Sequence, residues 1–85
     1  YWPPKAWFYR GKVYEDMDQP SLALECYLRA LEYEGENWDY EFWGRLYNQM
    51  GMLYAEQELY GKAMSFLRKA SAQYQLLKDA DKTGY

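Results

Sequence analysis

The sequence predicts an all-α fold of two antiparallel helix-turn-helix repeats, four helices in all, as a fragment of a longer array. First, some residues recur 40 positions apart, and a period of this size indicates stacked helical repeats. The identical pairs are Gly11/Gly51, Tyr14/Tyr54, Ala23/Ala63 and Ala30/Ala70. Second, apolar residues follow helical spacing in four segments. Third, Pro, Gly and capping residues separate these segments, and no segment alternates as a strand would.

The first helix is expected over residues 5–17. Its apolar side holds Ala6, Tyr9, Val13 and Met17 at helical intervals, with aromatic residues beside them. Pro3 and Pro4 suit its entrance, because proline is tolerated in a first helical turn and disfavoured later.

The second helix is expected from Leu22 to about Glu34. Asp18 or Gln19 can cap it, and Pro20 has the fixed φ that suits the first helical position. Gly35 ends it, as glycine commonly does after a helix.

The third helix is expected from an N-cap at Asn37 to about Gln57, with acidic residues in its first turn where the helix dipole favours them. After a tight turn over residues 58–61, the fourth helix is expected from Tyr60 to about Lys78. Residues 79–84 are polar and predict a connection.

Small residues predict how the helices pair. Gly11 with Ala23, and Gly51 with Ala63, are expected where two helices cross, because a minimal side chain lets the backbones approach closely. Glycine inside a helix costs about 1 kcal/mol relative to alanine, so its recurrence at one phase indicates a gain from packing. Replacing Gly51 by leucine should therefore lower stability by overpacking.

Composition and charge exclude several functions. The net charge is −3 and the Lys and Arg residues are scattered, whereas a nucleic-acid surface needs a basic stripe. No run of 18 apolar residues exists to span a membrane. The first residue is Tyr1, so we expect a segment of a longer chain. A single cysteine, Cys26, cannot form an internal disulfide, which favours a reducing compartment such as the cytoplasm.

These residues at this spacing resemble the tetratricopeptide repeat, a 34-residue helix–turn–helix unit that stacks into a right-handed superhelix. The period of 40 departs from that pattern, and the surplus around residues 38–43 is expected to lengthen the third helix. We expect repeat one over 4–37, repeat two over 38–79, and a further repeat or linker over 80–85. The Sel1-like repeat fits less well, because Tyr14 and Tyr54 lack the following glycine-rich turn. Longer-period repeats of bacterial regulatory proteins are also similar. The packing signature is Trp7, Gly11, Tyr14, Ala23, Tyr27 and Ala30 in the first copy, and Tyr47, Gly51, Tyr54, Ala63, Leu67 and Ala70 in the second.

The resemblance implies that the first helix of each repeat lines a concave, partner-binding face. The predicted partner-binding residues are Lys5, Phe8, Lys12 and Glu15 from one helix, and Arg45, Asn48 and Met52 from the next. Phe8 and Met52 would be the apolar anchors of a groove of mixed charge that holds a peptide. Phe8, Lys12 and Met52 replace the Lys and Asn residues of chaperone-binding members, so a chaperone-tail clamp is not expected. A solvated helix face without a partner is the alternative.

Catalysis, cofactors and metals are not expected. The sequence has no His, which removes the usual general base and the commonest metal ligand. Cys26 is expected to be a buried, inert thiol. The acidic residues of the central connection lack the glycine-turned pattern of a calcium loop; they are Glu32, Glu34, Glu36, Asp39 and Glu41.

Three functions therefore compete. The favoured one is a protein-interaction module, without nucleic acid or membrane as partner. The second is a small-ligand sensor with an aromatic pocket formed by Trp7, Trp38, Trp43 and neighbouring tyrosines. The third is a structural segment that self-associates through uncovered repeat ends.

Overall fold

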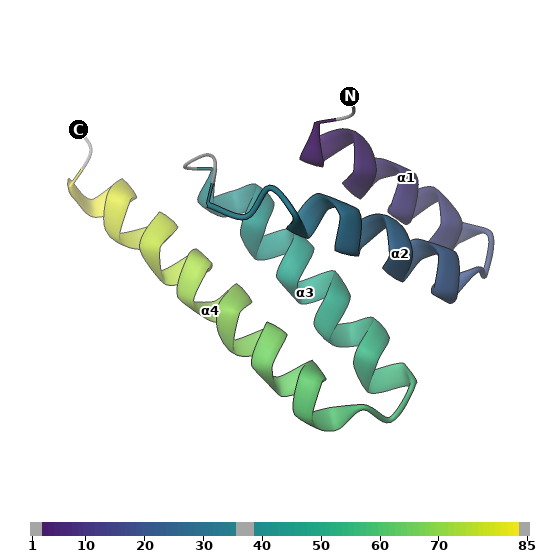
Figure 1. The fold of residues 1–85 in the computed structure, drawn as a ribbon. Coiled ribbons are helices and arrows are strands. Elements are labelled where there is room, and N and C mark those ends of the chain that lie inside the picture. The colour runs from purple at the N-terminus through teal and green to yellow at the C-terminus, as the bar shows by residue number, and fades with distance from the viewer. Residues whose placement is uncertain (1–2, 36–38, 84–85) are drawn as a thin grey trace. The chain divides into compact units, whose positions relative to one another are not determined.

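The computed structural model describes residues 3–35 and 39–83, with side chains described as far as residue 79. The described residues form four helices, and the chain divides into two compact units, Tyr1–Asn37 and Trp38–Tyr85. Each unit is a helical hairpin (Figure 1), and each is described by itself.

Unit 1 pairs α1 (Pro4–Asp16) with α2 (Pro20–Leu31). Pro4 and Pro20 each open a helix, where their missing N–H would have had no helical acceptor. The hairpin closes around Gly11: a Cβ there would lie 2.5 Å from Cε1 of Tyr27, whose side chain is fully buried. The glycine therefore provides the space that the Tyr27 ring occupies, as the predicted close crossing requires.

The apolar side of α1 that the sequence indicates is not the side that packs against α2. Tyr9, Val13 and Met17 are 61%, 54% and 59% exposed. The buried residues of α1 are instead Pro4, Phe8 and Gly11. The reason is that the Tyr27 ring selects the side of α1 on which Gly11 lies, so contact geometry, rather than the number of apolar residues, decides which side is covered.

Unit 2 pairs α3 (Tyr40–Glu56) with α4 (Tyr60–Thr83). Gly51 repeats the role of Gly11, since a Cβ there would lie 2.8 Å from Cγ and Cδ2 of Leu67 and 3.1 Å from the Ala63 carbonyl oxygen. Gly44 makes a further close approach, to Tyr74, which the first hairpin lacks because its helices are shorter. The equivalent placement of Gly11 and Gly51 confirms the repeated template.

The turn inside each hairpin is also repeated. Asp18 and Glu58, 40 residues apart, have left-handed backbones with φ of 60° and 62°. The amide of the next residue donates to a carbonyl five residues back, from Gln19 to Tyr14 at 2.8 Å and from Leu59 to Tyr54 at 2.9 Å. Such bonds close a helix end without glycine at this position, at some conformational cost.

Three helix boundaries differ from those predicted. α2 ends at Leu31, three residues before Glu34, and a turn leads to Gly35, whose φ is +89°. Asp39 caps α3 by accepting a hydrogen bond from the Phe42 amide at 3.0 Å, whereas the predicted cap, Asn37, lies outside the described residues. α4 runs on to Thr83 through the predicted connection, because residues 79–83 contain no proline or glycine to stop it.

Most of the packing signature is buried. The buried members are Gly11, Ala23, Tyr27, Ala30, Tyr47, Gly51, Tyr54, Ala63 and Ala70. Trp7 and Tyr14 are half-buried, and Leu67 is 38% exposed.

Candidate partner-binding surfaces

Four side chains form a continuous line along α3, here called the α3 stripe: Glu41, Arg45, Asn48 and Met52. They follow one another at intervals of four, three and four residues, which places them on one side of a helix. Arg45 Nη2 lies 2.8 Å from Glu41 Oε1, and Asn48 Nδ2 lies 3.6 Å from Met52 Sδ. Met52 is 52% exposed. The α3 stripe therefore offers an apolar end beside an amide and a charged pair, all within one unit.

The α1 residues of the predicted site are placed less favourably. Lys5 is exposed, and Lys12 and Glu15 are half-buried. Phe8 is only 5% exposed, and its ring centroid lies 5.7 Å from that of Tyr27. The prediction of Phe8 as an exposed anchor is wrong: it lies three residues before Gly11, on the side of α1 that Tyr27 covers.

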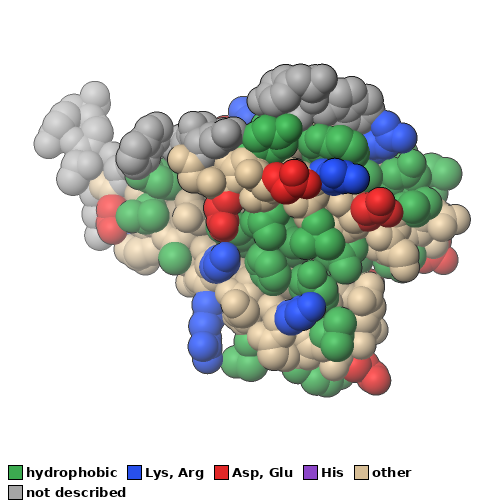
Figure 2. All heavy atoms as spheres, viewed as in Figure 1, with side chains coloured by type: hydrophobic (Ala, Val, Ile, Leu, Met, Phe, Trp, Pro, Cys, Tyr) green, Lys and Arg blue, Asp and Glu red, His purple; other side chains and the backbone are tan. Residues whose placement is uncertain are grey.

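The predicted groove draws on both units. Lys5, Lys12 and Glu15 belong to unit 1, whereas Arg45, Asn48 and Met52 belong to unit 2. The two sets are separate surfaces here, and their union as one concave face stays a prediction. On the face seen in Figure 2, charged side chains of both signs lie among hydrophobic ones, which agrees with the mixed character expected of a partner surface.

The predicted tryptophan pocket divides in the same way. Trp43 is 3% exposed and packs between Phe42, at 5.0 Å, and Tyr47, at 6.0 Å, so it fills the core of unit 2. Trp38 lies outside the described residues, whereas Trp7 lines a cavity of unit 1.

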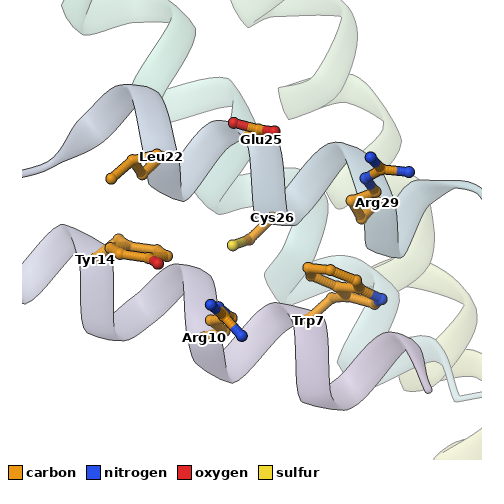
Figure 3. A pocket seen from close by; sticks show the side chains of 7 residues that line it. All are labelled: Trp7, Arg10, Tyr14, Leu22, Glu25, Cys26 and Arg29. Carbon is orange, nitrogen blue, oxygen red and sulfur yellow. The ribbon is translucent and has the colours of Figure 1, made fainter. Parts of the chain in front are cut away.

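That cavity, here called the α1–α2 pocket, was not predicted. It has a volume of about 230 Å³ and opens between the two helices of unit 1 (Figure 3). Its lining residues are Trp7, Arg10 and Tyr14 from α1 and Leu22, Glu25, Cys26 and Arg29 from α2. The pocket combines an indole, a phenol ring, two guanidinium groups and one carboxylate. One sequence signal could have revealed it, namely a small residue, Cys26, 40 positions before the large Phe66.

Cys26 is a poor nucleophile in this setting. It is 5% exposed, and burial raises the pKa of its thiol, an effect that the nearby Arg10 guanidinium partly opposes. The thiolate is the reactive form, so a raised pKa favours the inert thiol.

The acidic residues around the central connection have structural roles. Asp39 caps α3, Glu41 pairs with Arg45, and Glu32 Oε2 lies 3.6 Å from Arg29 Nη1. Glu36 lies outside the described residues. Within residues 3–35 and 39–83, no group of three or more acidic, Cys or His side chains is placed to hold a metal ion.

Models of the tetratricopeptide repeat match residues 4–37 and 44–72, one for each hairpin. The chain belongs to the tetratricopeptide repeat family. No curated protein and no solved structure matches it. Tetratricopeptide repeats generally mediate protein–protein interaction and typically serve as scaffolds rather than enzymes. Among the described helices, none has the length and apolar character needed to cross a membrane.

Proposed function

We propose that this pair of tetratricopeptide repeats is a protein-interaction module that docks a peptide or a partner domain within a larger, regulatory protein. The observation that carries the proposal is the α3 stripe. Met52 is half exposed on a rigid helix, next to Asn48 and to the Arg45–Glu41 pair. A partner helix or extended peptide would bury the methionine and exchange hydrogen bonds and charges with its polar neighbours.

Site-specific crosslinking tests the proposal. A photoreactive residue, p-benzoylphenylalanine, would replace Met52 on α3 or, as a matched control, Met64 on α4. The two methionines are 52% and 53% exposed, so exposure alone predicts equal crosslinking. We expect a partner adduct from position 52 that Arg45→Glu weakens, and none from position 64. Equal yields from the two positions, or an adduct indifferent to Arg45→Glu, would contradict docking at the α3 stripe.

Self-association is the second candidate function, and the exposed side of α1 favours it. Val13 is 54% exposed, although its equivalent in the second repeat, Leu53, is 4% exposed. Together with Tyr9 and Met17, it leaves an apolar row that a second copy of the chain could cover. Sedimentation at rising concentration should show association that Val13→Glu abolishes. A monomer at every concentration would remove this candidate.

A further inference from the structure

The counterpart of the α1–α2 pocket in unit 2 is filled by an aromatic ring. Phe66 stacks on Tyr54, with ring centroids 5.6 Å apart and planes inclined by 18°, and its centroid lies 6.2 Å from that of Tyr47. Lys69 Nζ lies 5.5 Å from the Phe66 centroid and 5.4 Å from that of Tyr47. The second hairpin thus holds three rings side by side with a cation over them.

The first hairpin has the same frame without the central ring. At the positions 40 residues earlier, Trp7 stands for Tyr47, Tyr14 for Tyr54 and Arg29 for Lys69. Cys26 stands where Phe66 does, and its thiol faces the space between Trp7 and Tyr14 (Figure 3). Because the cysteine side chain ends at its sulfur atom, the volume that a ring occupies in unit 2 is left open in unit 1.

The size of the opening suits one aromatic side chain. Its volume is about 230 Å³, and an apolar cavity of about 150 Å³ is known to admit benzene. Pockets that enclose a whole small ligand usually measure about 300–1,000 Å³. A single ring that projects from a larger partner therefore fits better than an entire free ligand.

The charges around the pocket indicate what accompanies that ring. Arg10 replaces Met50, which is fully buried in unit 2, and Arg29 takes the place of the cation over the rings. A guanidinium can stack on an aromatic face and can also bind a carboxylate in a forked geometry. With Glu25 the one acid among the lining residues, the pocket favours a ring with a neighbouring negative charge.

We propose that the α1–α2 pocket binds the aromatic side chain of a partner peptide, with an adjacent acidic residue paired to Arg10 or Arg29. The inference rests on the proposed interaction function and adds a specificity site to it. In this arrangement the bound ring takes the place in repeat one that Phe66 takes in repeat two.

The test is a titration of the isotope-labelled chain, followed by NMR, with the capped peptide Gly-Glu-Phe-Glu-Gly. We expect shifts at the Trp7 indole and at the Cys26 and Arg29 amides. Replacing the peptide phenylalanine by alanine should weaken binding by about tenfold or more, a factor equivalent to about 1.4 kcal/mol. Free 3-phenylpropionate should bind more weakly than the peptide.

Two variants at one position separate the pocket from the rest of the chain. Cys26→Phe should fill the pocket with its own ring, as Phe66 does, and weaken binding by about tenfold, whereas Cys26→Ala should leave affinity within about threefold. Both should fold, since phenylalanine is the natural residue at this position of the second repeat, and a thermal melt checks this.

Undiminished binding to Cys26→Phe would overturn the inference, as would equal affinity for the alanine peptide or tighter binding of 3-phenylpropionate. Shifts confined to the α3 stripe would also overturn it while supporting the proposed function. Conversely, shifts at the pocket, without a crosslink from position 52, would support the pocket and remove the α3 stripe as the docking surface.

Discussion

Replacing Gly11 by alanine should destabilise unit 1, because the added methyl group would meet the Tyr27 ring. The new Cβ would lie 2.5 Å, 2.8 Å and 3.0 Å from Cε1, Cδ1 and Cζ of that ring. Tyr27 is fully buried, so the ring cannot move aside into solvent. Overpacking of a rigid core costs about 1–3 kcal/mol, and alanine returns about 1 kcal/mol through its better helix propensity. With contacts this short we take the upper end, for a net loss of about 2 kcal/mol.

The same substitution at two other glycines provides matched controls. Gly51→Ala would also make short contacts, to Leu67 at 2.8 Å, but Leu67 is 38% exposed and can rotate away. Its loss should be smaller, near zero after the gain in helix propensity. Gly61→Ala meets nothing within 4 Å and should stabilise α4 by about 0.5–1 kcal/mol.

Thermal melts of the full chain, followed by circular dichroism at a helix band, measure the series. A change of 1 kcal/mol moves the Tm of a chain of this size by about 4–8 °C, so Gly11→Ala should lower it by about 8–16 °C. Urea denaturation should give the same order of stabilities. If Gly11→Ala were as stable as Gly61→Ala, the close approach of Tyr27 to α1 would be wrong.

Three further predictions concern a turn, a cap and the thiol. Glu58→Gly should raise stability by about 1 kcal/mol, because a left-handed backbone is unfavourable for residues with a Cβ, whereas Gln57→Gly, at φ −89°, should lower it; urea denaturation of both variants measures the difference. Asp39→Ala should cost about 1 kcal/mol by removing the acceptor of the Phe42 amide, and Asp39→Asn should retain most of the stability; equal melts for the two would exclude the cap. Burial raises the pKa of the Cys26 thiol, so the unfolded chain releases this proton first, and stability should decline as pH rises above about 8.5, the pKa of an unperturbed cysteine; a Cys26→Ala chain with the same decline would assign it to other groups.

Local residues were enough to predict most of the fold. The four helices, the four-residue recurrence of Gly11, Gly51, Ala23 and Ala63, and the family follow from periodicity and from residues that start or stop helices. These features depend on the chain within a turn or two of each position, which a sequence exposes directly. The end of α4 was missed because a polar segment without a helix breaker can continue a helix as readily as it can form a loop.

The side of α1 that packs, and with it the fate of Phe8, was decided by the tertiary structure. Periodicity gave two candidate sides, one with Tyr9, Val13 and Met17 and one with Phe8 and Gly11, and the second is covered because the Tyr27 ring fits only over a glycine. The α1–α2 pocket also depends on contact between helices, since an unfilled volume exists only once Trp7, Tyr14 and Cys26 face one another across the hairpin. Spacing along the chain determines which helices form, whereas the shapes of side chains from two helices determine which surfaces are buried and which remain open to a partner.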